Sequence, residues 1–293
     1  MDLIATIDDR PHRIRTERAE SLAIPMAFDG DQPNHFGAPL AAARPFRSGD
    51  FIGDTRRGGS CNVAEITLIP HCNGTHTESV AHILGDAVPV HGQLAGNLMT
   101  ARLITVAPVI GYTGPDAYTP PLETADRVIT REMLLRQIPG PEWEGFEALI
   151  LRTLPNGEEK RRAVYGGRHE PPFFTRDAMV HLATTGIRHL LVDFPSIDRM
   201  HDGGRLTNHR LFWNVPEKPP GRDLPLEPGS RPEDRSTHRA APPSPPRTDR
   251  TITEMIYVPD RIADGRYVLN LQLPAFQSDA APSRPIIYPL EEI

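Results

Sequence analysis

A twelve-residue segment of the sequence gathers the side-chain types that bind divalent metals in proteins. Residues 71–82 read H-C-N-G-T-H-T-E-S-V-A-H and contain three histidines, one cysteine and one carboxylate. Imidazole, thiolate and carboxylate groups are the usual ligands of Zn²⁺, and imidazole and carboxylate also suit Mn²⁺. In an extended chain, His76, Glu78 and His82 would project to one face. The segment therefore predicts a site for a divalent metal.

Two other interpretations remain open for Cys72. A thiolate is a nucleophile, and histidines lie beside Cys72 in the sequence, but no papain-type signature surrounds it. A lone cysteine is most often a small buried apolar residue, and we expect Cys61 to be one. Histidines in a polar loop can likewise be merely solvated, so the argument for a metal rests on the whole cluster.

A second group of polar residues follows the apolar run that ends at Val192. In chain order its members are Asp193, Asp198, His201, Asp202, Asn208, His209 and Arg210. Ligands of open α/β sheets bind at the carboxyl ends of the strands, which favours a functional role for this group. Asp193 and Asp198 could instead be turn residues beside Pro195, and His201 could be exposed. Glu254, on a short predicted strand, would ordinarily face solvent.

The apolar patterns predict an α/β fold. Apolar or β-branched runs predict strands within residues 62–69, 103–110, 148–153, 187–193 and 257–273. Amphipathic segments predict helices at 129–138, capped by Thr130, and at 175–185, with Thr175 as the N-cap. The β-α-β order indicates a sheet with buried strands. We expect the strand at 62–69 to deliver the metal cluster at its carboxyl end.

Composition and charge limit the classes of protein to consider. The chain has 293 residues, 32 of them proline, with 38% hydrophobic content and a net charge of −6. This charge attracts neither nucleic acid nor an acidic membrane, and the apolar runs fall short of the ~20 residues that span a bilayer. Two cysteines cannot form a disulfide framework, and the start does not resemble a signal peptide. We expect a cytoplasmic protein.

The sequence suggests a single domain with two additions. Residues 1–59 are rich in Arg, Asp, Pro and Gly and predict an N-terminal arm and edge segment, whereas residues 60–293 predict the domain itself. Regular patterns vanish within 214–250, where we expect a proline-rich insertion. Such a long excursion is usually a lid, an oligomer contact or a disordered segment.

These motifs resemble those of the bacterial kynurenine formamidase and "putative cyclase" family of metal-dependent hydrolases. Gly74-Thr75-His76, the acid Glu78 and His82 are similar to the family signature G-T-H-x-D-x-P-x-H. Further matches follow in the family's order: Asp193-x-Pro195-Ser196-Ile197-Asp198, Asn208-His209-Arg210 and Glu254. The resemblance runs from about Ser60 to Tyr288. It implies a swivelling β/α/β fold with a mixed sheet, which binds one or two divalent metals and hydrolyses an amide or lactam.

The resemblance also implies roles for individual residues. The implied metal ligands are His76, Glu78, His209 and Glu254, and His82 is the implied catalytic acid or base. Where the family has a histidine four residues before the G-T-H histidine, this chain has Cys72, with His71 one residue earlier. Either a one-residue bulge brings His71 into the site or Cys72 supplies a thiolate. The family's aspartate and proline are replaced by Glu78 and Val80.

The implied function is hydrolysis of a C–N bond in a small amide or cyclic amide by a water activated on Zn or Mn. Two alternatives remain: a metal-dependent cyclase or dehydratase, in which His82 removes a proton next to a carbonyl, and a binding protein whose site has decayed. We expect a small-molecule substrate, no nucleic-acid or membrane partner, and a homodimer or homotetramer built through the arm or the insertion. Candidates for substrate contacts are Asn34, His35, Phe36, Phe212 and Trp213, with ordinary packing as the alternative that we favour for them.

Overall fold

The structure is a computed structural model and describes residues 3–28, 30–85, 88–94, 96, 98–166, 170–217 and 244–293. The four α-helices of these residues are α1 (Pro70–Asn73), α2 (Arg131–Gln137), α3 (Arg176–Thr184) and α4 (Thr207–Phe212). The strands are β1 (Leu3–Ile7), β2 (Arg10–Ile14), β3 (Glu20–Ser21), β4 (Ala42–Pro45), β5 (Arg47–Ser48), β6 (Phe51–Ile52), β7 (Ala64–Thr67), β8 (His76–Ser79), β9 (Leu98–Val106), β10 (Val109–Ile110), β11 (Arg127–Ile129), β12 (Ala148–Thr153), β13 (Phe173–Phe174), β14 (His189–Val192), β15 (Thr251–Glu254), β16 (Gly265–Asn270), β17 (Ala280–Pro282) and β18 (Ile286–Glu292).

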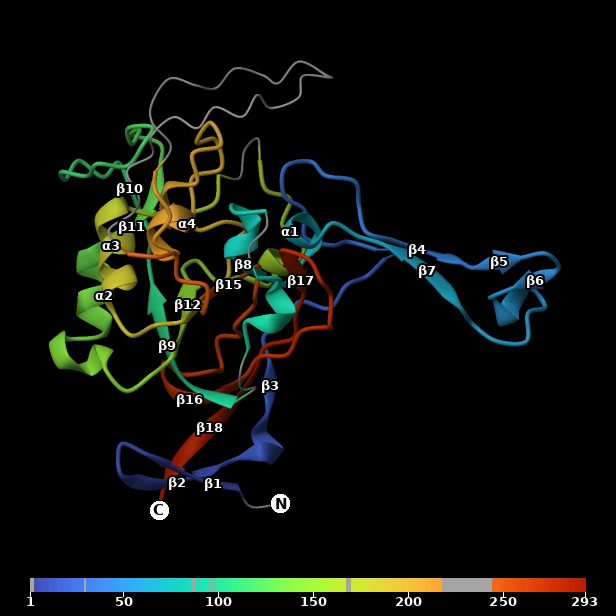
Figure 1. The fold of residues 1–293 in the computed structure, drawn as a ribbon, viewed down its shortest axis with the longest axis horizontal. Helices are drawn as coiled ribbons and strands as arrows, with labels where there is room; N and C mark the ends of the chain where they lie inside the picture. The colour runs from blue at the N-terminus through green and yellow to red at the C-terminus, as the bar shows by residue number, and fades with distance from the viewer. Residues whose placement is uncertain are drawn as a thin grey trace.

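An 11-stranded mixed sheet organises the molecule, in the order β1-β2-β18-β16-β9-β12-β14-β15-β8-β17, with β3 paired to β18. The neighbours β9, β12, β14 and β15 are parallel, and β8 runs antiparallel between β15 and β17. Helices α2, α3 and α4 gather on one side of this sheet (Figure 1). This architecture confirms the expected single-domain α/β fold.

The central strands are buried on both faces, as their continuous apolar runs indicate. Along β12, Leu149 and Leu151 pack into the core beneath the helices, whereas Ala148 and Ile150 pack into a second core on the opposite face. The strand alternates its side chains between two apolar layers and leaves none for solvent. The site described below lies where β15 and β8 continue this sheet.

Most of the predicted core elements agree with the structure. Strand β12 has the predicted bounds, and α2 and α3 are slightly shorter than the predicted helices. The Thr175 hydroxyl accepts a hydrogen bond from the Ala178 amide and so caps α3 as predicted, but the Thr130 side chain makes no such bond to α2. The run at 257–273 contains only the six residues of β16 as strand.

The predicted strand at 62–69 exists but has a different place from the one expected. As β7 it pairs antiparallel with β4 and is exposed throughout. Together with β5 and β6 it forms an arm, residues 40–69, that projects from the body (Figure 1). The metal cluster is instead carried by α1 and β8. The β-branched pattern correctly indicated a strand, but strand propensity does not specify the pairing partner.

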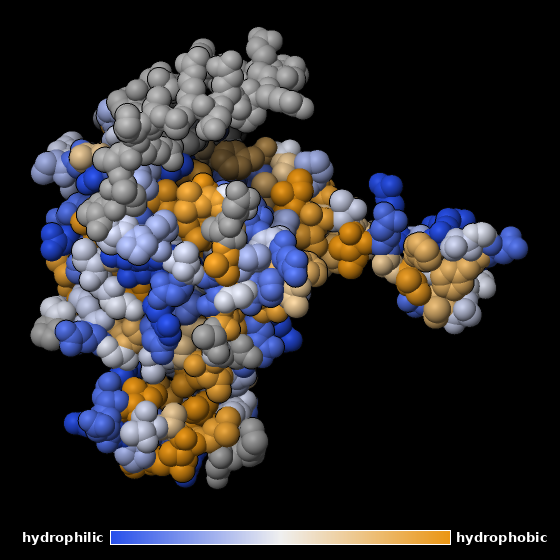
Figure 2. Space-filling view, viewed as in Figure 1, coloured by the Kyte–Doolittle hydropathy of each residue, from blue (hydrophilic) through white to orange (hydrophobic). Residues whose placement is uncertain are grey.

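Exposed apolar side chains line this arm. They are Leu40, Phe46, Val63, Ile66 and Ile69, which are between 38% and 59% exposed, and Figure 2 shows apolar surface on the arm. Cys61 also lies here and is exposed, so the expectation of a buried Cys61 was wrong. The first part of the predicted N-terminal arm does not project from the body, because β1, β2 and β3 extend the main sheet beside β18.

The two ends of the proline-rich segment lie side by side. The Asn214 carboxamide donates to the carbonyls of Ser244 and Pro245, and the Arg247 amide donates to the Trp213 carbonyl. The predicted insertion, 214–250, otherwise falls largely on residues 218–243, which lie outside the described part of the chain. Among the described residues, no helix combines the length and the apolar character needed to cross a membrane.

The buried faces of β12 should dominate stability. We predict that Ile150→Ala, at a fully buried position, lowers the free energy of unfolding by about 2–5 kcal/mol through lost contacts and a residual cavity. The matched variant Ile110→Ala, at a position 66% exposed, should change it by less than about 0.5 kcal/mol. Urea unfolding followed by circular dichroism measures both, and equal effects would contradict this assignment of the core.

Candidate metal centre

Strand β8 holds the centre of the site. His76 and Glu78 alternate along β8 and therefore project to the same face of the sheet. In the β8–β15 ladder His76 lies directly opposite Glu254, and on the other side β17 pairs Ala280 with Glu78. Residues opposite one another in a ladder share a face, so Glu254 belongs to the cluster and is only 3% exposed. A strand assigned from sequence alone would have turned it to solvent.

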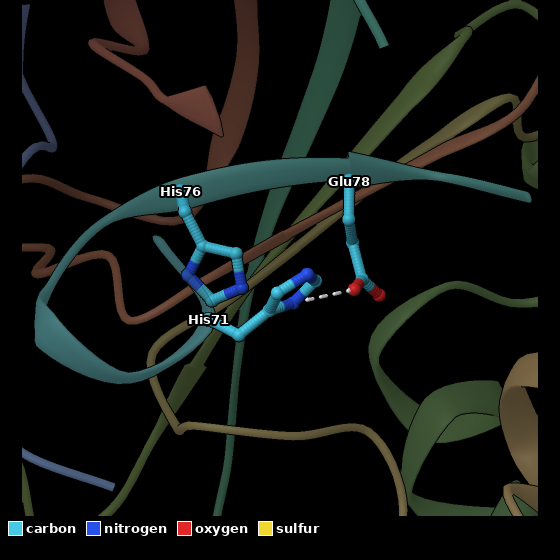
Figure 3. Close-up of side chains that lie close together, drawn as sticks. All are labelled: His71, His76 and Glu78. Carbon is cyan, nitrogen blue, oxygen red and sulfur yellow. Dashed lines mark ion pairs between the residues drawn. The ribbon is translucent and has the colours of Figure 1, made fainter. Parts of the chain in front are cut away.

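The short helix α1 contains both His71 and Cys72, and its conformation determines which of the two side chains lies in the cluster. Its Asn73 side chain is buried, accepts a hydrogen bond from the Ile69 amide and donates one to the Pro39 carbonyl. In this fixed turn the His71 ring points toward Glu78 (Figure 3), with Nδ1 3.1 Å from Glu78 Oε2. The bulge that brings His71 to the site is therefore a helical turn.

Cys72 does not belong to the groups of possible metal ligands that the structure brings together. Three groups of described residues bring ligand atoms within 4.8 Å of one another: His71, His76 and Glu78; His71, His82 and Asp279; and Glu78, His82 and His209. None of them contains Cys72. Burial, followed by the negative charge of Glu254, raises the pKa of its thiol, which opposes both thiolate ligation and nucleophilic attack. The structure brings His71 into the cluster and leaves Cys72 out, so the predicted Cys72 ligand is not supported.

Two buried atoms in the cluster lack a hydrogen-bond partner. His76 Nδ1 lies 3.0 Å from the Gly74 carbonyl, which can only accept, so Nδ1 carries the proton and Nε2 keeps its lone pair. Among the described residues, this Nε2 and Glu78 Oε2 have no hydrogen-bond partner, although Glu254 Oε2 lies 3.4 Å from the former and His71 Nδ1 lies 3.1 Å from the latter. Buried polar atoms without partners are rare, and both of these are electron-pair donors. A divalent cation would satisfy both, so the residues present fit a metal.

His209 is held by a carboxylate on each side. Its Nδ1 lies 2.6 Å from Asp198 Oδ2 and its Nε2 lies 2.8 Å from Glu78 Oε1. Asp198 in turn accepts hydrogen bonds from the Tyr118 hydroxyl and the Asn208 amide, both at 2.7 Å. Glu254 is similarly fixed, because its Oε1 accepts from the Ile197 amide at 2.9 Å. This outer layer of contacts resembles the supports that orient metal-binding histidines.

The electrostatics of the cluster favour positive charge at its centre. Burial alone would raise the pKa of Glu78, but His82 and His209 outweigh it and hold the pKa well below the ordinary value. Burial alone would lower the pKa values of His71 and His209, but hydrogen bonds and charges of the carboxylates raise that of His71 to about 10 and that of His209 well above its ordinary value. The buried carboxylates therefore stay ionised and require cationic partners.

The members of the cluster differ in their exposure to solvent. The side chains of His76 and Glu78 are 0% and 1% exposed, whereas those of His82 and Asp279 are 27% and 41% exposed. A small molecule would therefore approach past His82, His71 and Asp279.

Sequence reasoning did not single out Asp279. It precedes β17, about two hundred residues after His82, and only the pairing of β17 with β8 brings it to the site. No motif or spacing in the sequence pointed to it. The hydroxyl of Tyr118, which holds Asp198, was missed for the same reason.

The other polar residues after β14 have structural contacts. Asp193 accepts hydrogen bonds from the Thr153 amide and hydroxyl at 2.8 Å and pairs with Lys160 at 2.7 Å, which fastens the loop after β12. Asp202 accepts backbone hydrogen bonds from Gly204 and Leu206, and His201 is exposed. The Arg210 side chain donates to backbone carbonyls of Arg205 and Pro216.

The expected substrate-contact residues fall into three classes. Phe212 and Trp213 are completely buried in the core, although the Trp213 ring lies 5.4 Å from that of His209. Phe36 is 60% exposed. His35 is buried and donates its backbone amide to Cys72. Burial, followed by the charges of His76, His201 and His71, lowers its pKa to about 4, so its ring is neutral beside the cluster.

Known proteins share this fold. A predicted metal-dependent hydrolase from Bacillus stearothermophilus superposes with a TM-score of 0.54 at 15% identity, over 92% of this chain and 98% of that one. A potential metal-dependent hydrolase with cyclase activity gives 0.54 at 16% identity, over 93% and 98%. An isatin hydrolase bound to the product analogue thioisatinate gives 0.53 at 12% identity, over 95% and 94%. No curated protein sequence matches the chain.

At these low sequence identities, the similar structures show only a common fold. A family model shows in addition which family the chain belongs to. The model described as "Putative cyclase" matches residues 12–199, which is more than half of the chain. The match includes the Gly74-Thr75-His76 motif, Glu78 and His82, whose arrangement in space is described above. The chain belongs to the cyclase family.

Proposed function

We propose that this chain is a metal-dependent hydrolase that cleaves a C–N bond of a small amide or cyclic amide. The observation that carries the proposal is the pair of buried electron-pair donors, His76 Nε2 and Glu78 Oε2, that lack hydrogen-bond partners inside a cluster of imidazoles and carboxylates. The fold supports it, because the similar structures include proteins described as a metal-dependent hydrolase and an isatin hydrolase.

The proposed ligands are His71, His76, Glu78, His209 and Glu254, which offer nitrogen and oxygen donors compatible with one or two Zn or Mn ions. When bound, such a metal would supply a Lewis acid for a carbonyl oxygen and a coordinated water of lowered pKa. The protein contributes a fixed and largely dry surrounding: Asp198 orients His209, the Ile197 amide orients Glu254, and the core covers His76.

His82 is the proposed general acid and base. It lies in the more exposed part of the cluster, with Nδ1 3.9 Å from Glu78 Oε2 and 3.4 Å from Asp279 Oδ2. From this position the ring can take a proton from the attacking water and return one to the leaving nitrogen. The same residues could serve a cyclase or dehydratase, and the two reactions differ in their products, because hydrolysis adds one water.

Metal content tests the proposed ligands. We predict one or two equivalents of Zn or Mn per chain in the wild type, a marked loss in His76→Ala and His71→Ala, and full retention in Cys72→Ser. Elemental analysis of purified, folded protein measures this. Loss in Cys72→Ser with retention in His71→Ala would reverse the assignment of the first ligand. A wild type that binds neither metal after reconstitution would support the binding protein with a decayed site.

Turnover tests the role of His82. We predict that His82→Ala lowers kcat by about 10²–10⁴-fold while metal content stays unchanged, because the variant removes a proton carrier and no ligand. Isatin and an N-formyl arylamine serve as probe substrates in ¹⁸O-labelled water, and mass spectrometry should find one labelled oxygen in the carboxylate product. His12→Ala, far away on β2, is the control. A product without the added water would favour the lyase, and loss of metal would make His82 a ligand.

The arm supports the expectation of a homo-oligomer. Exposed apolar side chains gathered on one part of a protein favour association, and the resemblance to the family implies copies of the same chain as the partner. We predict that Phe46→Ser combined with Ile66→Ser reduces the mass in solution to that of the monomer, measured by light scattering after gel filtration. Ile110→Ser, at an apolar position that is 66% exposed and lies outside the arm, should leave the mass unchanged. A monomeric wild type would refute this use of the arm.

A further inference from the structure

We propose that Asp279 is a positioning residue shared by two histidines: it holds the candidate ligand His71 and fixes the proton arrangement of the candidate general base His82. The inference rests on the proposed function in that it assigns Asp279 to the same site. It adds a residue that lies outside the matched motif and on a separate segment of the chain.

One carboxylate oxygen contacts both rings. Asp279 Oδ2 lies 2.8 Å from His71 Nε2 and 3.4 Å from His82 Nδ1, and the two rings lie 4.3 Å apart between centroids. The backbone of Asp279 is fixed, because its carbonyl accepts a hydrogen bond from the Ser79 amide at 2.9 Å. The next residue, Ala280, begins the pairing of β17 with β8. The carboxylate is therefore attached to the same sheet that carries Glu78.

For His71 the contact determines which nitrogen faces the cluster. An ionised carboxylate only accepts hydrogen bonds, so His71 Nε2 donates to Asp279. Nδ1 then faces Glu78 Oε2 at 3.1 Å. His209 has the same arrangement with its nitrogens exchanged, since Nδ1 faces Asp198 and Nε2 faces Glu78.

For His82 the same reasoning sets the tautomer. The nearest carboxylate to Nδ1 is Asp279, because Glu78 Oε2 lies at 3.9 Å, beyond hydrogen-bond reach. Nδ1 therefore donates to Asp279, and Nε2 is left with the lone pair that a general base needs. In hydrolases with a Ser-His-Asp triad, the aspartate orients the catalytic histidine in the same way. Asp198 is buried and lies 2.6 Å from His209 Nδ1, so Asp198 holds His209 whereas Asp279 contacts His71 and His82.

The test compares Asp279→Ala with Asp31→Ala, an exposed aspartate elsewhere on the surface. Two quantities are measured on the full chain without substrate: the Zn²⁺ dissociation constant by competition with a chelator, and the tautomer of His82 by long-range ¹H–¹⁵N NMR of ¹⁵N-histidine-labelled protein, with and without Zn²⁺. We expect Asp279→Ala to weaken Zn²⁺ binding by about 10–100-fold, as loss of an orienting partner does. We also expect the His82 proton to move from Nδ1 to Nε2. Asp31→Ala should change neither.

The outcomes separate this inference from the proposed function. If the wild type binds Zn²⁺ and Asp279→Ala changes neither affinity nor tautomer, the inference is overturned and the metal site stands. If only stability falls, Asp279 is merely structural and the inference is likewise overturned. If the wild type binds no Zn²⁺, the proposed function fails, as does the part of the inference that concerns His71. The His82 tautomer in the metal-free protein still decides the remaining part.

Discussion

The structure depends on a buried carboxylate. Glu78 is 1% exposed on a strand in the interior of a sheet, and an isolated ionised carboxylate in that place would cost several kcal/mol or more. The chain keeps it ionised by surrounding it with imidazoles. His209 Nε2 lies 2.8 Å from one oxygen, and His71 Nδ1 lies 3.1 Å from the other. Removing Glu78 would leave those rings without their partner, and removing the rings would leave the carboxylate unpaired.

This constraint explains why distant segments converge on β8. His71 arrives through the turn α1, His209 through α4, Glu254 through its place opposite His76 in the ladder, and Asp279 through the start of β17. The side chains of these groups are held by further contacts: His209 by Asp198, Glu254 by the Ile197 amide and His71 by Asp279. Fixed donors around a charge need no reorganisation when a cation binds, which suits a metal-dependent enzyme.

The sequence motifs identified the central residues of the site but did not decide between His71 and Cys72. The structure brings together five residues that the sequence had singled out: His76, Glu78, His82, His209 and Glu254. The first three could be recognised because they are close along the chain, and the last two because they belong to motifs. The choice between His71 and Cys72 could not be made from spacing, since neighbouring residues in a turn point in different directions. It was decided by Asn73, whose side chain ties α1 to Ile69 and Pro39.

What the sequence by itself determined was local: the metal-binding composition of residues 71–82, the buried strand β12 with its bounds, and the helix α3 with its cap at Thr175. These follow from side-chain chemistry, apolar periodicity and capping, which act over a few residues. The tertiary structure decided that β7 lies in an exposed arm, that Glu254 is buried and that Asp279 joins the site. Pairing between strands far apart in sequence determines these features, and a single strand's pattern does not record its partner.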